Sequence, residues 1–194
     1  AYSQNALFHI RTRRGLRIPV YGPPQPWPQL SPEFQAAQVA ALEKTLTRAS
    51  RRRRDADPSY NCHGLTLAGK LGWVGCISVG EPDRRLVLPS VRNSTIDGPT
   101  ADRHVGALLQ DRCSLVARLA RCGPAPHLGF PNQIELGDIA VYRSYHPQRD
   151  DWEVTHSGLV VKVDISSGGQ VDNFWVLSKF AHAGEYIHPF SCVP

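Results

Sequence analysis

The fold is decided by a stretch in the last third of the chain, His156-Ser157-Gly158-Leu159-Val160-Val161-Lys162-Val163. Its near-continuous apolar run is typical of a strand buried on both faces. The turn residues Ser166-Ser167-Gly168-Gly169 follow, and a second strand-forming run extends from Asn173 to Phe180. Two such runs joined by a short Gly-rich turn predict a β-hairpin at residues 156–180.

Shorter strands are predicted on either side of this hairpin. Gly137 opens the run Asp138-Ile139-Ala140-Val141-Tyr142, and Tyr186-Ile187-His188 is predicted as a short last strand. The segments before residue 113 are instead helical or rich in turn residues. Because helices come first and antiparallel strands follow, the order predicts an α+β fold with N-terminal helices packed on a C-terminal antiparallel sheet.

Three helices are predicted, the last of them over residues 101–112. The first begins at Ser31-Pro32-Glu33, where a capping hydroxyl precedes proline at the first helical position, and it should run to about Ala49. The second should extend from Asn61 to Leu71 and end before Gly72. The predicted inward faces are Phe34, Ala37, Ala41, Leu42 and Leu46 in the first helix and Leu65, Ala68 and Leu71 in the second.

The remaining segments are predicted as an arm and loops. Residues 1–30 are rich in Arg and Pro, and the prolines at 23–28 exclude helix and central strand, so we expect an extended arm. Residues 78–100 predict a long loop with at most a short strand at 86–88. We therefore expect an N-terminal arm plus helix over residues 1–55 and one main domain over residues 56–194.

Composition restricts the class of protein. The chain has 194 residues, of which 41% are hydrophobic and 20% charged, and these values are typical of a globular protein. It has no run of about eighteen apolar residues, so no membrane span is expected. It begins at Ala1 and contains no Met, so we expect a processed product or a piece of something longer. Five cysteines fit either up to two disulfides or a set of reduced thiols.

Arginine dominates the net charge of +5. Four arginines lie between residues 11 and 17, and four more form the run Arg51–Arg54. Such clusters suit nucleic acid or an anionic polymer, but a solvated basic face at the end of a helix is the favoured interpretation. Because no aromatic residues interleave the run, nucleic acid is not expected as a partner.

Cys62 lies where a nucleophile would be activated. In Tyr60-Asn61-Cys62-His63-Gly64-Leu65 it occupies the first turn of a predicted helix. The N–H groups and partial positive charge of a helix start favour a thiolate and can stabilise an oxyanion. Tyr60 and Asn61 are candidate substrate contacts. His63 is expected to face solvent or to lie behind the reacting groups. No metal and no other cofactor is expected, because adjacent ligands such as Cys62 and His63 rarely fit one tetrahedral centre.

His156 is the best candidate for the base that a cysteine nucleophile needs. It lies at the mouth of the apolar strand 156–163, which would hold it rigidly, and Gly158 leaves room beside it. The alternative for each residue alone is structural: a buried thiol, and a histidine at a strand end. Taken together, the two favour covalent catalysis.

Three motifs in this order resemble those of the NlpC-type and CHAP-type amidohydrolases of the papain-like superfamily. They are Asn61-Cys62-His63-Gly64-Leu65, Gly137-Asp138-Ile139-Ala140-Val141-Tyr142 and His156-Ser157-Gly158-Leu159-Val160. The resemblance covers about residues 56–190 and implies a papain-like fold with Cys62 as nucleophile and His156 as base. The chain departs from the family at His63, where members usually have Ser or Thr, and in the long segment between the first two motifs, which implies inserted loops.

The third catalytic residue is left open by the resemblance. The family carries it on the strand after the base, and Val176-Leu177-Ser178-Lys179-Phe180 has no such residue at the expected place. Glu185 and His188 are the nearest alternatives, and Glu185 is favoured because a carboxylate stabilises an imidazolium. Ser178 and Lys179 are candidate substrate contacts, and His188 a candidate orienting residue.

The resemblance implies a hydrolase that cleaves an amide or peptide bond, with peptidoglycan stem peptide as the candidate substrate. It favours a secreted or periplasmic location, and a monomer is expected. Two alternatives stay open. A deamidase- or protease-type toxin or effector would use the same two residues, and a binding module that has lost activity would keep the same fold.

Overall fold

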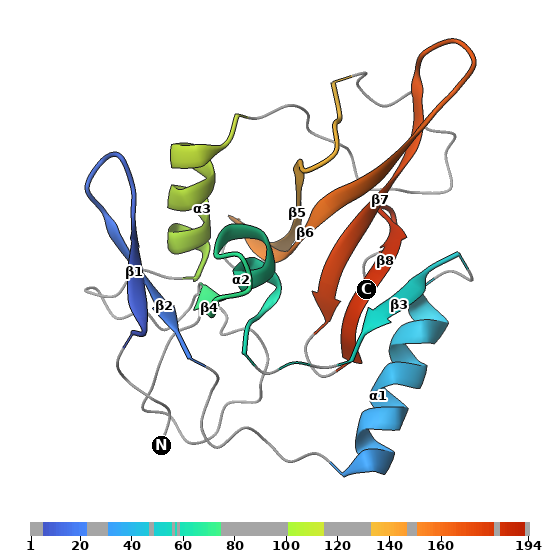
Figure 1. The fold of residues 1–194 in the computed structure, drawn as a ribbon, viewed down its shortest axis with the longest axis horizontal. Helices are drawn as coiled ribbons and strands as arrows, with labels where there is room; N and C mark the ends of the chain where they lie inside the picture. The colour runs from blue at the N-terminus through green and yellow to red at the C-terminus, as the bar shows by residue number, and fades with distance from the viewer. Residues whose placement is uncertain are drawn as a thin grey trace. The chain divides into compact units, whose positions relative to one another are not determined.

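The structure is a computed structural model, and it describes residues 6–22, 31–46, 49–55, 57, 59–74, 101–114, 133–146, 151–180 and 183–192. The helices and strands of these residues are labelled in Figure 1. In chain order they are β1 (Phe8–Arg11), β2 (Arg17–Tyr21), α1 (Pro32–Thr45), β3 (Arg51–Arg54), α2 (Cys62–Leu67), β4 (Trp73–Val74), α3 (Ala101–Arg112), β5 (Ile139–His146), β6 (Asp151–Ile165), β7 (Val171–Phe180) and β8 (Gly184–Pro189). The predicted mixture of helix with a C-terminal antiparallel sheet is confirmed, and the strand predicted at 86–88 lies outside the described residues.

The chain divides into two compact units that interleave along the sequence. Unit 1 comprises Ala1–Leu30, Asp57–Cys113 and Val141–Ser157, and unit 2 comprises Ser31–Ala56, Ser114–Ala140 and Gly158–Pro194. Strands β5 and β6 therefore each have residues in both units. The expected division separates the chain once, between residues 55 and 56, whereas the two units are each made of several segments. The division into residues 1–55 and 56–194 stays a prediction.

Unit 1 contains a three-stranded antiparallel sheet in the order β1-β2-β4. In the β1–β2 hairpin Phe8 pairs with Val20, and Arg11 lies directly opposite Arg17. This hairpin was not predicted from the sequence, and residues 23–30, where the prolines indicated an arm, lie outside the described residues. Strand β2 alternates, with Ile18 and Val20 buried, and β1 buries Ile10 alone, but the density of arginine hid this pattern in the sequence.

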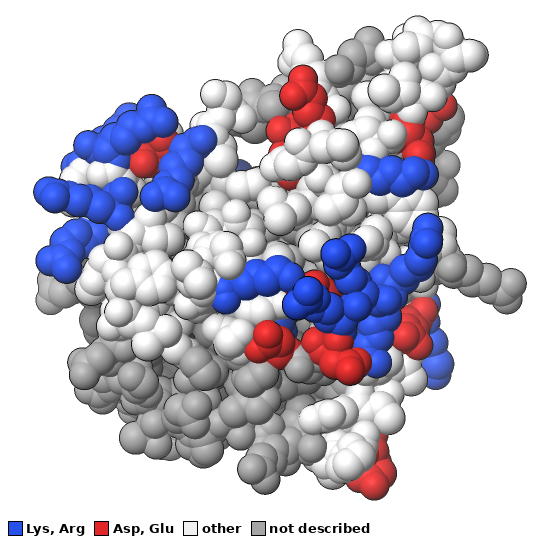
Figure 2. Space-filling view, in the orientation of Figure 1, with Lys and Arg blue, Asp and Glu red and all other residues white. Residues whose placement is uncertain are grey.

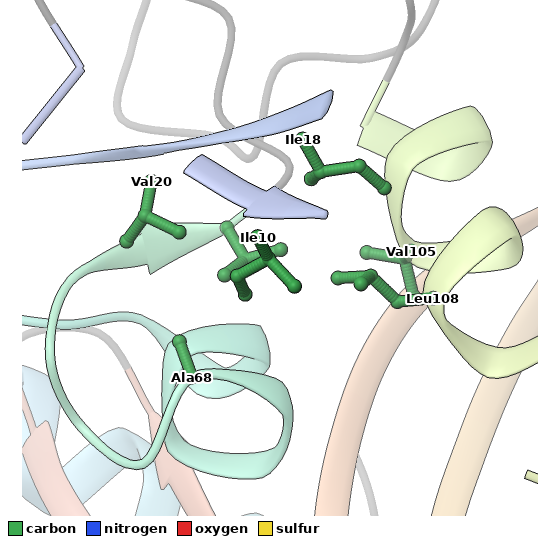
Figure 3. Packing of buried hydrophobic residues seen from close by; sticks show 7 residues of the cluster. Ile10, Ile18, Val20, Ala68, Val105 and Leu108 are labelled. Atoms are coloured by element: carbon green, nitrogen blue, oxygen red, sulfur yellow. The ribbon is translucent and has the colours of Figure 1, made fainter. Parts of the chain in front are cut away.

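The core of unit 1 joins this sheet to two helices (Figure 3). Buried apolar side chains from β1, β2 and β4 meet Ala68, which follows α2, and two residues of α3. The cluster is Ile10, Ile18, Val20, Ala68, Val74, Val105 and Leu108. Helix α3 has the predicted bounds of 101–112. The helices of unit 1 are thus held by apolar burial against a small sheet.

Helix α2 begins where predicted but ends at Leu67, four residues before the predicted end. The chain leaves the helix through Gly69 and Lys70, which adopt φ values of +58° and +69°. Ala68 is buried as predicted, but Leu71 is 66% exposed and not part of an inward face. Periodicity alone extended the helix too far, because left-handed residues ended it before the apolar pattern did.

Unit 2 carries most of a five-stranded sheet in the order β3-β8-β7-β6-β5. The predicted hairpin is formed by β6 and β7, with Gly158 opposite Ser178 and Val163 opposite Phe174. Strand β8 pairs with β7, so that Lys179 faces Glu185 across the ladder. The core on this sheet is Ile134, Val160, Val171, Phe174, Val176 and Phe190.

Helix α1 is capped as predicted, because Ser31 Oγ accepts a hydrogen bond from Phe34 N at 3.2 Å. It ends at Thr45 and not at Ala49, and none of its residues is buried. The predicted inward residue Phe34 is 49% exposed. Of the predicted inward residues, Leu42 packs against the core and Leu46 is buried, and Val39 joins them. The apolar residues of α1 therefore form a narrower contact than the sequence predicted.

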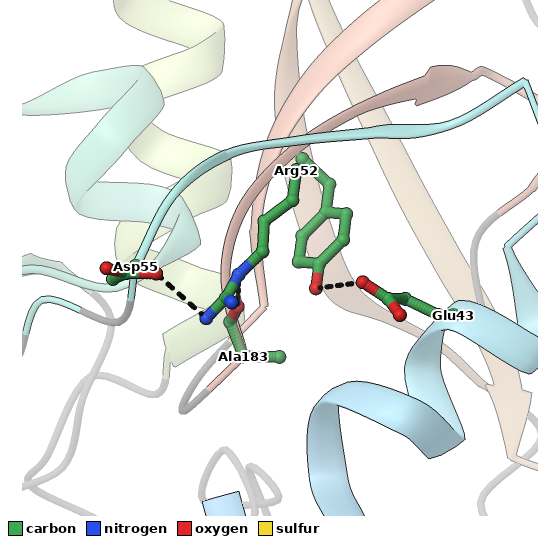
Figure 4. A network of polar contacts seen from close by, with 5 residues as sticks. Glu43, Arg52, Asp55 and Ala183 are labelled. Atoms are coloured by element: carbon green, nitrogen blue, oxygen red, sulfur yellow. Dashed lines mark hydrogen bonds and ion pairs between the residues drawn. The ribbon is translucent and has the colours of Figure 1, made fainter. Parts of the chain in front are cut away.

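The run Arg51–Arg54 forms the edge strand β3, which corrects the prediction of a helix end, although its exposure is as expected. Arg52 Nε donates to Ala183 O at 3.3 Å, and its guanidinium lies 3.1 Å from Asp55 (Figure 4). Figure 2 shows basic side chains over β3 and over the β1–β2 hairpin. Charged edge strands resist pairing with other chains, which gives the run a structural role.

None of the described helices combines the length and apolar character needed to cross a membrane.

Candidate functional site

The start of α2 is fixed by Asn61, the residue before Cys62. Asn61 Oδ1 accepts from Gly64 N at 2.7 Å, which caps the helix, and from Val74 N at 3.2 Å. Asn61 Nδ2 donates to Val74 O at 2.9 Å. One side chain thus caps α2 and attaches it to β4. Cys62 is the first residue of α2 and is held in place by this attachment.

Gly64 allows the segment after α2 to pass close to the helix. A β-carbon at this position would overlap the backbone carbonyl oxygen of Gly72. The glycine of the Cys62 motif is therefore required by packing between α2 and the chain that leads into β4. The space beside Gly64 is filled by the protein's own backbone.

A hydrogen-bonded chain of side chains connects α2 to β6. His63 Nδ1 lies 2.8 Å from Ser157 Oγ, and Ser157 Oγ lies 2.8 Å from Thr66 Oγ1. Thr66 Oγ1 is 3.3 Å from the carbonyl oxygens of both Cys62 and His63, one turn earlier. We call His63, Ser157 and Thr66 the α2–β6 network. It joins residues that are 94 positions apart in sequence.

His63 is buried in this network, with 1% of its surface exposed. Burial lowers the pKa of His63 to about 4, so the imidazole is neutral at pH 7. Of the two positions expected for His63, burial excludes the one facing solvent, and a position behind the reacting groups stays a prediction. A neutral buried imidazole next to Cys62 adds no positive charge to the sulfur, and its contribution is structural.

Cys62 and His156 both belong to unit 1 and are both buried, at 5% and 8% exposure. The ring of His156 packs against that of Tyr142 in β5, with centroids 5.7 Å apart and planes tilted by 46°. His156 directly precedes Ser157, and Cys62 directly precedes His63. The network thus brings together the chain neighbours of both candidate catalytic residues.

The candidates that precede Cys62 lie in the same unit. Tyr60 is buried, and the ammonium of Lys70 lies 5.5 Å from the centre of its ring. Asn61 is buried too and is engaged with Gly64 and Val74, as described above. Its hydrogen bonds make it a structural cap, and a role in substrate contact stays a prediction for both residues.

The other candidates lie in unit 2, on β7 and β8, and all are buried: Ser178, Lys179, Glu185 and His188. Ser178 Oγ and His188 Nε2 are 2.9 Å apart, and His188 Nδ1 lies 2.8 Å from Pro189 O. Glu185 has a carboxylate oxygen 3.9 Å from Nε of Arg54. The structure joins Ser178 to His188, and the role of Glu185 toward His156 stays a prediction.

Sequence reasoning missed Ser157 and Thr66 as parts of the site. A signal was present: His63 and Thr66 are polar residues three apart in an apolar helix, so they share one face, and Ser157 is a polar residue inside an apolar strand. Polar groups buried at such positions need hydrogen-bond partners, and these three side chains bind one another.

Among the residues that the structure describes, no group of three or more His, Cys, Asp or Glu side chains is arranged to hold a metal ion. Comparisons of the chain with protein-family models, curated proteins and solved structures found no match. The resemblance to papain-like enzymes therefore depends on the three sequence motifs.

Proposed function

We propose that the protein is a cysteine hydrolase with a papain-like fold, in which Cys62 is the nucleophile and His156 the general base. The observation that carries this proposal is the 2.8 Å contact between His63 Nδ1 and Ser157 Oγ. Each partner in that contact is the direct chain neighbour of one proposed catalytic residue, and consecutive Cα atoms are about 3.8 Å apart. The contact therefore brings the backbones of Cys62 and His156 close together. Because successive strand side chains point to opposite faces, the meeting of sulfur and imidazole itself is what the experiment below tests.

The chemistry of such a pair is acyl transfer. The Cys62 thiolate attacks the carbonyl carbon of an amide, and the C–N bond breaks as His156 protonates the leaving amine. An acyl-enzyme remains. His156 then accepts a proton from water, the resulting hydroxide attacks the acyl carbon, and the thiolate leaves. N–H groups in the first turn of α2 are candidate donors to the oxyanion.

The substrate class and the third residue come from the resemblance and from chemistry. Similarity to the NlpC-type and CHAP-type enzymes supports an amide or peptide bond, with peptidoglycan stem peptides as the candidate substrate. Glu185 is the proposed orienting residue, because a carboxylate stabilises an imidazolium. A deamidase- or protease-type toxin would carry out the same first step on a different substrate.

An inactive binding module is the second candidate, and the low exposure of Cys62 favours it. Cys62 is 5% exposed, and thiols buried in apolar surroundings are inert. The two candidates differ in what they predict for the sulfur. A catalytic Cys62 is reactive despite its burial, and a structural one is not.

Alkylation by iodoacetamide between pH 5 and pH 9, read by peptide mass spectrometry, tests the proposal. Cys62 should be labelled faster at pH 7 than the exposed Cys113. His156→Ala should slow the labelling of Cys62 by about 30-fold, because an unactivated thiol is only a few per cent thiolate at pH 7. The labelling of Cys113 should not change.

The matched control is His9→Ala, at an exposed histidine of β1, which should leave the labelling of Cys62 unaltered. Labelling of Cys62 that is slower than that of Cys113 in the unmodified protein, and that is insensitive to His156→Ala, would establish the inert module. Amide cleavage in stem-peptide fragments, abolished by Cys62→Ala and by His156→Ala, then tests the substrate class.

A further inference from the structure

The α2–β6 network has a defined direction of hydrogen bonding. A backbone carbonyl can only accept, so Thr66 donates its one hydroxyl proton to the carbonyl of Cys62 or His63. Thr66 Oγ1 then accepts from Ser157, whose hydroxyl also has one proton. Ser157 Oγ must in turn accept from His63 Nδ1. If Thr66 instead donated its proton to Ser157, neither contact between Thr66 Oγ1 and a carbonyl oxygen would contain a proton.

The tautomer of His63 follows from this order. Its Nδ1 carries the hydrogen, and a neutral imidazole has only one N–H group. Burial lowers the pKa of His63 to about 4, which agrees with a neutral ring that donates from a single nitrogen at pH 7. Burial thus accounts for the neutral ring, and the order of donors in the network assigns the hydrogen to Nδ1.

The network completes the placement of α2 on two sides. Asn61 holds the start of the helix to β4, and the network holds the same turn to β6. Cys62 contributes its carbonyl to the network and is the first residue of the helix that the network holds. A shift of α2 relative to β6 would move the sulfur relative to the strand that carries His156.

We propose that His63 is a positioning residue, whose Nδ1–H bond to Ser157 sets the separation between the nucleophile Cys62 and the base His156. This inference rests on the proposed cysteine hydrolase function. His63 touches no substrate and transfers no proton in it. The bond acts only by holding α2 against β6, and misplacement of reacting groups by about 1 Å can cost about 100-fold in rate.

The test replaces His63 by residues that move the donor. In His63→Asn the amide nitrogen takes the place of Nδ1, whereas in His63→Gln it lies near the place of Nε2. His63→Leu keeps volume without a donor. His63→Asn should keep the alkylation rate of Cys62 within about 3-fold of the unmodified protein, and His63→Gln and His63→Leu should lower it by at least about 10-fold. In His63→Gln and His63→Leu, but not in His63→Asn, the pH profile of Cys62 alkylation should shift to that of an ordinary thiol.

Two controls separate positioning from packing. At the exposed His9, Asn and Gln should be equivalent. In a Ser157→Ala background, His63→Asn should lose its advantage over His63→Gln, because the acceptor is gone. Equal alkylation rates and equal pH profiles for His63→Asn and His63→Gln, in proteins that urea titration shows to be folded, would overturn the proposal.

A second pair of variants covers the case in which no His63 variant folds. Thr66→Val and Ser157→Ala interrupt the network at its other members, and both should slow the alkylation of Cys62. Thr45→Val is the matched control, because its hydroxyl caps only Ala41 O in an exposed turn of α1. Unchanged rates in both Thr66→Val and Ser157→Ala would overturn the proposal.

Failure of the positioning role differs from failure of the proposed function. If only His63 lacks its role, His156→Ala still slows alkylation while His63→Asn and His63→Gln remain equal. If Cys62 is not catalytic, His156→Ala has no effect on its alkylation, and the dependence on His63, Ser157 and Thr66 disappears with it.

Discussion

Unit 1 and unit 2 each contain a buried histidine hydrogen-bonded to a serine, and the two pairs run in opposite directions. In unit 1, His63 donates from Nδ1 to Ser157. In unit 2, His188 Nδ1 faces the carbonyl of Pro189, which can only accept, so Nε2 must accept a proton from Ser178. Serine is the acceptor from histidine in the first pair and the donor to it in the second.

The pairs also differ in what they join. His63 and Ser157 are 94 positions apart and connect a helix to a strand, whereas Ser178 and His188 are 10 apart within the β7–β8 ladder. Backbone pairing already sets the separation of β7 and β8, so the second pair mainly satisfies buried polar groups. The first pair sets a separation that no backbone ladder between α2 and β6 can set. Identical residue types therefore have different structural effects.

The largest expected effect comes from the glycine beside each pair. Gly64→Ala would drive a β-carbon into the backbone oxygen of Gly72, and backbone yields little, so we expect a loss of more than about 4 kcal/mol or no folded protein. Gly158→Ala meets the side chains of buried Val176 and Ser178 and, less closely, the backbone oxygen of Leu177, so about 3 kcal/mol is expected. Urea unfolding followed by circular dichroism measures both.

Gly106→Ala in α3 is the matched control, because no atom lies within 4 Å of its added methyl. It should stabilise the helix by up to about 1 kcal/mol. A Gly158→Ala protein less stable than Gly64→Ala would show that the β6–β7 ladder, and not the packing beside α2, is the less adaptable region.

Acid should affect the first pair more than the second. The pKa of His63 is lowered to about 4, so the unfolded chain, with a histidine pKa near 6.5, binds more protons between those values. Stability contributed by neutral His63 is complete above about pH 6.5 and falls as pH drops toward 4, by about 3 kcal/mol. Burial also lowers the pKa of His188, and its bond to Pro189 opposes the shift.

Urea midpoints between pH 4 and pH 7 compare the two histidines. His63→Asn should flatten the acid-side decline in stability more than His188→Asn does. An equal or larger flattening by His188→Asn would mean that the pair in unit 2 is the acid-sensitive one.

The smallest effects are expected from the serines. Ser157 has two side-chain partners, His63 and Thr66, and Ser178 has His188 as its partner in the pair. Ser157→Ala should therefore cost about 2–3 kcal/mol and Ser178→Ala about 1–2 kcal/mol, since each leaves buried polar groups unsatisfied. The difference in urea midpoint between the two variants measures the difference in lost stability. A larger loss in Ser178→Ala than in Ser157→Ala would argue that the α2–β6 network is weak.

Local patterns predicted much of the chain correctly. The cap at Ser31, the start of α2 at Cys62, the bounds of α3 and the β6–β7 hairpin all follow from caps and periodicity. The predictions failed where contacts with residues far away in the sequence determine the secondary structure or the burial. Arg51–Arg54 became a strand because β8 offers a ladder, and Phe34 is exposed because α1 packs through other residues.

Only part of the candidate site was predicted, because its remaining contacts also depend on long-range partners. The order of the motifs selects Cys62 and His156, but no local pattern shows that His63 would be buried or that Ser157 would accept its proton. The sequence shows Ser157 and Thr66 as polar residues in apolar elements, but only the contact between helix and strand shows that they bind each other and His63.

By itself the sequence determined the three helices, the C-terminal strands, the capped start of α2 and the two residue types that favour covalent chemistry, because caps, turns and periodicity act over a few residues. Tertiary structure alone decided the burial and tautomer of His63, its bond to Ser157 and the edge position of β3. Those features depend on groups dozens of positions apart, and desolvation and hydrogen-bond pairing act only after folding has brought such groups together.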